Sequence, residues 1–411
     1  MTTSHAEITI IGGGQGGLTA ALAFAANGLP VTVLNSADYA DIDFDAYDGR
    51  AFSLTPTSVA LMKSLGIWDQ LSSKAQPMND ILVTDGRLSD GAAPLFLHFE
   101  GADTQTGVLA HMVESRYLMA ALLEAARAHP AIKLVSPTRV DQIDRQSEDV
   151  TLTLNGGEKH TTELLVAADG GQSPTRTALG FQTTSWAYRQ KGIVTTVTHA
   201  RPHHGVAQEY FLPGGPFAIL PLIDDADGRH RASLVWTEKE DIANAIMGLD
   251  DTKFTQELGR RFGDYLGDVA PIGPRYSYPL QFMQARDFAG PCTALIGDAA
   301  HVIHPLAGMG LNLGLRDAAA LAECVGDAVK LGFDVANPTA LRRYETWRRA
   351  DVTAMGVVTD GLNRLFSNDV PPVRLIRDLG LGLVDRIKPV KQLLTKAATG
   401  DMGPVPKLMQ N

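Results

Sequence analysis

The sequence predicts an α/β fold in which a parallel-sheet domain is interrupted by a β-rich insertion and ends in a helical tail. Three features of the chain indicate this arrangement. A strand, a glycine-rich turn, a helix and a second strand follow one another within residues 7–34. Residues 192–236 are rich in strand-forming residues. From residue 293 a buried-strand pattern returns and leads into two long helical stretches.

The composition is that of a globular protein. Of the 411 residues, 45% are hydrophobic and 20% are charged, which excludes a disordered, collagen-like or coiled-coil chain. At ~150 residues per domain, this length allows two or three domains and a large core. The net charge of −10 disfavours binding to nucleic acid. The two cysteines, Cys292 and Cys324, make no disulfide framework and favour a reducing, cytoplasmic location.

The first motif is the glycine-rich turn between a strand at 7–11 and a helix at 18–27. It contains the pattern G-x-G-x-x-G and one polar side chain, at Gly12, Gly14, Gly17 and Gln15. In dinucleotide-binding folds the first glycine permits a tight turn, and the second lets the backbone approach a pyrophosphate. The third lets the helix pack closely on the strand. A second strand at 31–34 completes a βαβ unit, which predicts a Rossmann-like parallel sheet.

Residues 8–37 carry no charged side chain, so their length alone suggests a membrane span. The glycine cluster and Pro30 interrupt the stretch, and no basic segment precedes it. Neither a spanning helix nor a signal peptide is therefore expected.

The second strand ends in an amide where dinucleotide-binding folds have an acid. That acid binds ribose hydroxyls ~20 residues after the glycine turn. This chain has Asn35 there, which hydrogen-bonds a hydroxyl less strongly than a carboxylate does. Asp38 lies close by and is the alternative ligand.

The other predicted elements alternate between helices and strands. Before residue 180 we expect helices over 55–71 and 114–128, strand structure over 81–99, a hairpin over 132–154 and a buried strand over 163–168. After it we expect a mixed or antiparallel sheet over 192–236, and helices over 251–265, 315–331 and 338–366.

These elements predict a discontinuous nucleotide-binding domain formed by residues 1–75, 106–180 and 288–366. Residues 76–105 and 181–287 form an inserted β-sheet domain, which is expected to bind the substrate. Residues 367–411 form a tail of short amphipathic helices. Seven Lys or Arg face only three Asp in residues 371–411, a net charge of +4 on a chain that is acidic overall.

Two further motifs place carboxylates at the ends of buried strands. Asp169 begins the run DGGQSPTR, and Asp298 lies in GDAAH. The carboxyl edge of a parallel sheet is where α/β folds bind ligands, and a sugar-like chain can hydrogen-bond the Asp298 carboxylate. Gly308 and Gly310 then let a loop backbone approach a ligand and open a helix whose positive end stabilises an anion.

In this order the motifs resemble the class A flavoprotein aromatic monooxygenases, and within them the ubiquinone-biosynthesis hydroxylase family. The resemblance covers nearly the whole chain. It includes DGRAFSL at 48–54, ESRYLMAALLE at 114–124, EYFLPGGPFAILPL at 209–222, the block 297–317 that ends in GLNLGLRD, and YETWRRAD at 344–351.

The resemblance implies FAD as the cofactor. The positions that match the family's glycine turn, phosphate and ribose contacts, shared FAD and NADPH motif, ribityl ligand and flavin loop are Gly12, Gly14, Gly17, Arg50, Arg116, Asp169, Asp298, Pro305, Gly308, Gly310, Leu311 and Asn312. Gln15 and Asn35, from the glycine turn and the end of the second strand, complete the predicted cofactor-binding set. The family has Gln between the two loop glycines, where this chain has Met309, and this leaves the substrate preference open. No side chain is identified as a catalytic base, and the flavin-loop candidates for a catalytic role are Pro305, Gly308 and Met309.

The resemblance also implies the reaction. NAD(P)H reduces FAD, O₂ gives a C4a-hydroperoxyflavin, and a hydroxyl group passes to the ring of a prenylated phenol in ubiquinone biosynthesis. Tyr210, Phe211 and Pro221 are the candidates for lining the substrate pocket. Two alternatives remain: a class A hydroxylase of a small soluble aromatic, or a non-catalytic flavin-binding scaffold in a quinone-biosynthesis complex.

Two other features point to what the protein binds. His301 and His304 have no third ligand at a suitable spacing, so no metal site is expected. Residues 373–396 mix Leu, Ile and Val with Arg and Lys, a pattern that allows contact with an anionic membrane surface through residues 371–411. A C-terminal helix packed on the body, or an oligomer contact, is slightly favoured over the membrane contact. The predicted location is the cytoplasm, with peripheral contact on the inner membrane face.

Overall fold

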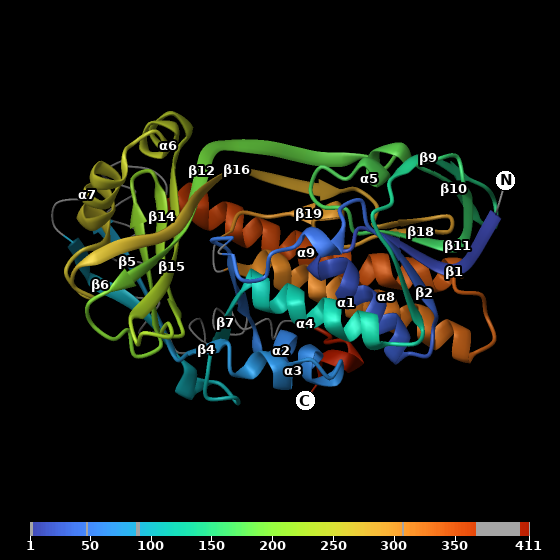
Figure 1. The fold of residues 1–411 in the computed structure, drawn as a ribbon, viewed down its shortest axis with the longest axis horizontal. Coiled ribbons are helices and arrows are strands. Elements are labelled where there is room, and N and C mark those ends of the chain that lie inside the picture. The colour runs from blue at the N-terminus through green and yellow to red at the C-terminus, as the bar shows by residue number, and fades with distance from the viewer. Residues whose placement is uncertain (1–2, 47, 88–90, 306–307, 367–402, 411) are drawn as a thin grey trace.

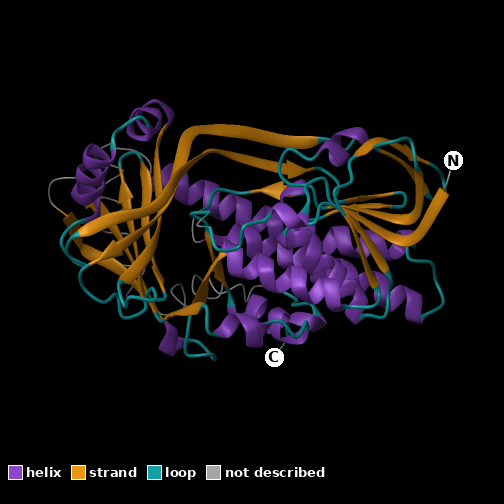
Figure 2. Ribbon diagram, in the orientation of Figure 1, coloured by secondary structure: helices purple, strands orange, loops and turns teal. Residues whose placement is uncertain are grey.

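The computed structural model describes residues 3–46, 48–87, 91–305, 308–366 and 403–410. Two lobes lie side by side and are joined by two long strands, β12 (Thr183–His199) and β16 (Val269–Ala285) (Figure 1). Figure 2 shows that one lobe combines a sheet with a layer of long helices, whereas the other is mostly sheet. Among the described residues, no helix is both long and apolar enough to cross a bilayer.

The first lobe is built on a sheet with the order β17–β18–β11–β1–β2–β8, parallel except for the β17–β18 pair. Its strands are β1 (Thr3–Ile11), β2 (Val31–Leu34), β8 (Ile132–Val135), β11 (Lys159–Ala167), β17 (Ala289–Gly290) and β18 (Thr293–Leu295). Alternate residues face opposite sides, so Ile8 and Val166 join the large core while Leu165 joins a smaller one. The predicted Rossmann-like sheet is confirmed.

Helices cover the core side of this sheet. They are α1 (Gln15–Ala26), α4 (Ser115–Ala128), α8 (Met309–Lys330) and α9 (Pro338–Phe366). α1 is almost entirely buried because it lies among the sheet, α4 and α8, and its many alanines allow this close packing. The helix α9 has the predicted bounds. α8 begins at Met309, before the predicted residue 315, because Gly308 takes a left-handed conformation (φ 62°) and the helix follows at once.

Smaller elements complete the lobe. They are the three-stranded sheet β3 (Ala51–Leu54), β7 (Ala110–Glu114) and β4 (Ala75–Met78), with α2 (Pro56–Ser64), α3 (Trp68–Ser72), β9 (Val140–Arg145), β10 (Val150–Leu154) and α5 (Pro174–Ala178). The predicted hairpin over 132–154 is wrong in part. β8 pairs with β2 in the parallel sheet, and only β9 and β10 form the hairpin. Pro137 separates the two regions because it cannot donate a ladder hydrogen bond.

The second sheet has the order β19–β16–β12–β15–β14–β13–β5–β6. Its other strands are β5 (Asp80–Arg87), β6 (Gly91–Glu100), β13 (Val206–Leu212), β14 (Gly215–Leu222), β15 (His230–Lys239) and β19 (His301–Val302). β5 pairs with β13, so the ranges 76–105 and 181–287 contribute strands to one sheet. The helices α6 (Glu240–Met247), which the sequence did not predict, and α7 (Asp251–Phe262) cover one face around Phe217 and Trp236.

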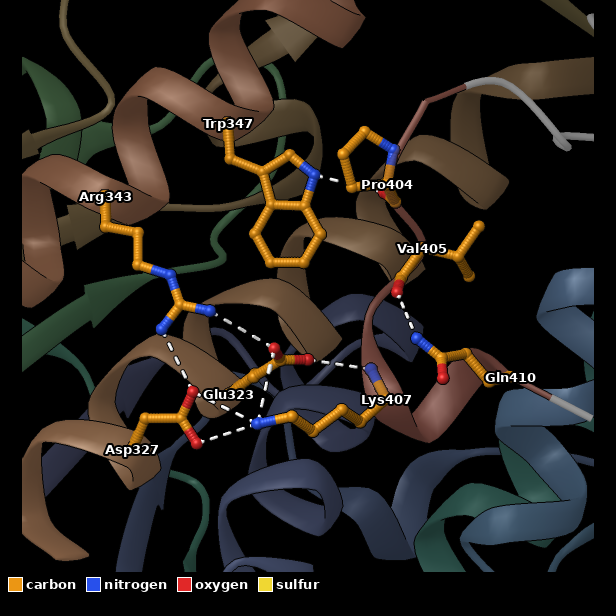
Figure 3. Close-up of polar contacts among 8 residues, drawn as sticks. All are labelled: Glu323, Asp327, Arg343, Trp347, Pro404, Val405, Lys407 and Gln410. Carbon is orange, nitrogen blue, oxygen red and sulfur yellow. Dashed lines mark hydrogen bonds and ion pairs between the residues drawn. The ribbon is translucent and has the colours of Figure 1, made fainter.

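The C-terminal segment 403–410 packs back onto the first lobe (Figure 3). The carbonyl of Pro404 accepts hydrogen bonds from Arg316 (2.6 Å) and Trp347 (3.1 Å). The backbone N–H of Lys407 donates to Glu323 (2.7 Å), and its ammonium lies 2.9 Å from Asp327. Packing on the body therefore holds for this last part of the tail. The predicted amphipathic helices fall largely in residues 367–402, outside the described residues.

A buried ionic network joins α8, α9 and the end of β18. Both Asp317 and Arg348 have fully buried side chains, and Asp317 Oδ1 accepts from Arg348 Nε at 2.7 Å. Asp317 Oδ2 accepts from His301 Nε2 (2.6 Å) and from the backbone N–H of Gly297 (2.9 Å). Burial opposes ionisation of Asp317, but His301 and Arg348 outweigh it and lower the pKa of the carboxyl. Tyr344 adds a hydrogen bond to the Leu295 carbonyl (2.7 Å).

We expect Asp317→Asn to lower the free energy of unfolding by about 3 kcal/mol, because it removes the fully buried counter-charge of Arg348 and leaves only the more exposed Asp351 carboxylate beside that guanidinium. Urea unfolding of the purified variant measures this. The exposed Asp103→Asn exchange is the matched control and should stay within about 0.5 kcal/mol of the original. A similar small change for Asp317→Asn would contradict the role given to the network.

Candidate active site

A cavity of about 740 Å³ lies between the two lobes. Its first end is lined by the glycine turn, by Arg50 and the neighbouring β3, and by the loops after β11 and β18. Its second end is lined by the inner face of the second sheet and the adjoining strands, through Met78, Ile81, Val83, Phe99, Leu109, Ala110, Ala207, Gln208, Glu209, Pro216, Ala218, Leu220, Val235 and Thr237. The cavity therefore combines a backbone-lined polar end with a largely apolar end, as ligand sites commonly do.

The glycine turn requires its glycines for different reasons. Gly12 has φ 107°, and a Cβ there would lie 2.4 Å from the Ala168 carbonyl oxygen. A Cβ at Gly17 would lie 1.8 Å from the Gly12 carbonyl oxygen. A Cβ at Gly14 would meet nothing within 4 Å, although Gly14 lines the cavity. Gly12 and Gly17 are thus required by the fold itself, whereas Gly14 leaves room for something in the cavity.

The N-terminus of α1 faces this end of the cavity. Gly14 is its N-cap, no side chain caps it, and its first turn contains no acidic residue. The first N–H groups of a helix lack intrahelical partners and carry a partial positive charge. An uncapped helix start beside a cavity is a suitable place for phosphate groups.

Asn35 lines the cavity, whereas Asp38 does not. The Asn35 Oδ1 accepts a hydrogen bond from the Gly13 N–H (3.1 Å), and its Nδ2 donates to the Ala37 carbonyl (2.8 Å). The carboxylate of Asp38 instead accepts from the Ala40 N–H at the start of a 3-10 turn. Asn35 therefore also holds the glycine turn in place, a role that the sequence did not indicate.

The two arginines differ in position. Arg50 lines the cavity, with one guanidinium nitrogen 3.2 Å from the Asp48 carboxylate. Arg116 is not among the lining residues; it donates to the Asp45 carbonyl (2.6 Å) and the Tyr117 hydroxyl (2.9 Å). Gln15 lines the cavity and donates to Ser115 (3.1 Å), the residue before Arg116.

The two strand-end carboxylates both line the cavity. Asp169 accepts from the Ser173 hydroxyl and from the Thr175 N–H (3.0 Å), so it organises the turn before α5. Asp298 is exposed into the cavity and makes no hydrogen bond with any described residue. The surrounding walls raise its pKa by burial. Asp298 thus presents an unpaired carboxylate to a bound ligand.

The loop before α8 divides its residues between the cavity and the core. Pro305, Gly308, Gly310 and Leu311 line the cavity. Met309 does not face it: the side chain is buried and packs against Phe282, Ile303 and Leu313. Its thioether fills a core position.

Asn312 is also turned away from the cavity. Its Oδ1 accepts from Ser58 (2.7 Å) and its Nδ2 donates to the Ser53 carbonyl (2.6 Å). It therefore connects the start of α8 to β3 and to α2.

The predicted substrate-pocket residues Tyr210, Phe211 and Pro221 are absent from the cavity lining. Tyr210 projects to the opposite face of the sheet and packs on the core under α6 and α7. Phe211 shares the cavity face but packs against Leu97, Phe99 and Leu109. Successive strand residues alternate in direction, so the lining positions are the neighbours of the predicted ones.

Glu209 is the lining residue with an ionisable side chain that sequence reasoning missed. Burial alone raises the pKa of its carboxyl group to about 7. It makes no hydrogen bond with a described residue. The period-two pattern of EYF could have indicated it, because Tyr210 on the core face requires Glu209 on the other.

The described residues contain no group of three His, Cys, Asp or Glu side chains that could hold a metal ion. His301 is engaged with Asp317, and His304 packs edge-on against Tyr188 at 5.1 Å.

Residues 5–357 match the model of the FAD binding domain family. The chain is 43% identical to ubiquinone hydroxylase UbiL of Rhodospirillum rubrum, over 98% of this chain and 91% of the relative. It is 33% identical to 3-demethoxyubiquinol 3-hydroxylase of Escherichia coli, over 97% of this chain and all of the relative. The chain belongs to the ubiquinone-biosynthesis hydroxylase family of FAD-dependent monooxygenases. FAD is therefore its cofactor.

Solved structures agree on the fold. The p-nitrophenol 4-monooxygenase of Pseudomonas putida superposes with a TM-score of 0.79 at 21% identity, over 98% of this chain and 100% of that one. At this identity the likeness shows the fold that this hydroxylase shares with other flavin monooxygenases.

Two glycine substitutions should separate cofactor binding from folding. In Gly14→Ala the new methyl group meets no protein atom but reduces the space for the pyrophosphate, so we expect FAD to bind roughly tenfold or more weakly with apoprotein stability unchanged. In Gly17→Ala the methyl group collides with backbone, so we expect the apoprotein to lose about 1–3 kcal/mol of stability. Fluorescence titration with FAD and urea unfolding of the apoprotein measure the two effects. Equal behaviour of the two variants would contradict the assignment.

Proposed function

We propose that this protein is an FAD-dependent monooxygenase that hydroxylates the aromatic ring of a prenylated phenol in ubiquinone biosynthesis, with NAD(P)H as reductant and O₂ as oxidant. The observation that carries the proposal is one continuous cavity that joins a glycine turn and helix start to a largely apolar sheet face. The names of the relatives, ubiquinone hydroxylase and 3-demethoxyubiquinol 3-hydroxylase, support the same reaction class.

The residues of the first end would hold FAD. The backbone of Gly14 and the uncapped start of α1 would bind the pyrophosphate, and Asp298 would accept hydrogen bonds from ribityl hydroxyl groups. Arg50 would supply positive charge for the phosphates. Pro305, Gly308 and Gly310, which line the same cavity, would lie along the flavin ring.

FAD, when bound, supplies the chemistry that accepts a hydride from NAD(P)H and activates O₂. The contribution of this chain is orientation and exclusion of water. The apolar lining from the second sheet would displace water from around the ring carbon to be hydroxylated. Its aliphatic side chains also suit a substrate that carries a prenyl chain, because burial of each CH₂ group contributes about 0.8 kcal/mol.

The proposal predicts that cells without the protein accumulate a quinone precursor that lacks one hydroxyl-derived oxygen. Mass spectrometry of the quinone lipids measures this and identifies the ring position. The purified FAD-loaded protein should also convert a short-chain prenylated phenol to its hydroxylated product at the expense of NAD(P)H. An unchanged lipid profile, together with NAD(P)H oxidation that yields only hydrogen peroxide, would contradict the proposal.

We propose further that residues 371–402 contact an anionic membrane surface, which is where a prenylated substrate partitions. The basic and apolar composition of this segment supports the contact. A partner quinone-biosynthesis complex is the other surface that the segment would suit.

Exchanging Arg374, Arg377, Lys388 and Lys391 for Gln should weaken binding to vesicles rich in anionic lipid by about tenfold or more, because each nearby cation contributes ~1 kcal/mol. The exchange leaves the docked segment 403–410 intact, so it avoids the instability that truncation would introduce. The control exchanges four exposed cations elsewhere: Lys63, Arg139, Lys253 and Arg260. Vesicle sedimentation measures both, and equal binding would refute the membrane contact.

A further inference from the structure

Glu209 stands in a row of aliphatic side chains that crosses the second sheet. In the register of the strands it lies beside Val83 of β5 on one side and Ala218 of β14 on the other. Ala218 in turn lies beside Val235 of β15. Paired residues in a sheet share a face, so all four point to the cavity, and all four line it. A carboxyl group in the middle of such a row contributes nothing to apolar packing.

The surroundings of Glu209 offer its carboxyl group no partner. It has no hydrogen bond or ion pair with any described residue, and the cavity that it lines is also lined by the apolar side chains of Phe99 and Leu109. The other charged side chains that line the cavity are Arg50, Asp169 and Asp298, which belong to the glycine-turn end. An unpartnered carboxyl group in an apolar site is costly to keep ionised, which is why burial raises its pKa toward neutrality.

The proposed reaction requires a proton acceptor at this end of the cavity. A ring carbon beside a phenol oxygen attacks an electrophilic oxygen more readily when the phenol has lost its proton, because the oxygen then donates electron density into the ring. Water is the default acceptor, but the aliphatic lining excludes it. General bases work best when they titrate near the working pH and lie within hydrogen-bond reach of the proton.

We propose that Glu209 is the catalytic base that accepts the phenol proton of the substrate, an inference that rests on the proposed ring hydroxylation. In this step the phenol O–H bond breaks, its electron pair stays on the phenol oxygen, and the proton forms a new O–H bond with a Glu209 carboxylate oxygen. No electron leaves either partner. Glu209 also selects the orientation of the ring, since the hydroxyl group must point toward β13.

Equilibrium binding tests the proposal without turnover. The FAD-loaded, oxidised protein is titrated calorimetrically with ortho-prenylphenol and with its methyl ether, from about pH 6 to pH 8. The ionised carboxylate accepts a hydrogen bond from the phenol, so phenol affinity should rise about fivefold to tenfold over this range. The ether has no proton to donate and favours the neutral acid, so its affinity should fall by a similar factor.

Three variants complete the binding experiment. Glu209→Gln should bind both compounds with affinities that do not change with pH. Glu209→Asp keeps the carboxyl group and should keep the opposite trends of phenol and ether, which guards against an effect of misfolding. Glu124→Gln, at an exposed position of α4, is the matched control and should behave like the original protein. FAD content and unfolding midpoints are compared throughout.

Turnover adds a second readout. Glu209→Gln should lower kcat for the hydroxylated product by about 100-fold or more, while NAD(P)H oxidation continues and hydrogen peroxide accumulates. Normal product formation by Glu209→Gln, or the same pH trend for phenol and ether, would overturn the role of Glu209. Absence of ring hydroxylation in the original protein, with the opposite pH trends intact, would instead refute the proposed function and leave Glu209 as a binding group.

Discussion

The hydrogen bonds of the Asp317 carboxylate are the interactions on which the geometry of the cavity depends. Asp317 lies on α8, yet its hydrogen bonds reach the Gly297 backbone, the ring of His301 and the guanidinium of Arg348 on α9. The segment between Gly297 and His301 contains Asp298, so the network fixes the carboxylate that faces the cavity. Buried ion pairs add little net stability compared with apolar packing, but losing one partner is costly. The network therefore sets the geometry of this edge more than it adds to stability.

The two ends of the cavity have opposing physical requirements. Its first end needs backbone close to a charged ligand, which small residues and an uncapped helix provide. Its second end needs an apolar wall, and an apolar wall makes any carboxyl group expensive to ionise. Glu209 is such a group, and the core would be better packed without it. Because its apolar surroundings disfavour the ionised carboxyl group, the presence of this residue is more simply explained by function than by folding.

Much of the first lobe follows from local patterns. The glycine turn, the two flanking strands and α9 were predicted closely, because each depends on chain-local features such as turn glycines and apolar periodicity. Residues 76–105 were assigned to the same β-sheet domain as residues 181–287, but the parallel pairing of β5 with β13 was not predicted, since it links segments more than 100 residues apart. Arg116, Met309 and Asn312 were predicted from their places in the motifs, but they are not among the residues that line the cavity. No local sequence pattern indicates which of these side chains line the cavity and which pack in the core.

The register of β13 and β14 carries the most information about the substrate. Neighbouring strand residues face opposite sides of the sheet, so Tyr210 and Pro221 face the core whereas Glu209 and Leu220 face the cavity. A shift of one residue in either strand would therefore change the chemistry of the pocket. Met309 departs from the family pattern, yet its burial among Phe282, Ile303 and Leu313 means that it packs the loop and does not contact the cavity. Differences in substrate preference between this chain and its relatives are therefore to be sought in the cavity-facing residues of these two strands. Among them Glu209 has a carboxyl group that can accept the hydrogen bond of a phenol hydroxyl group.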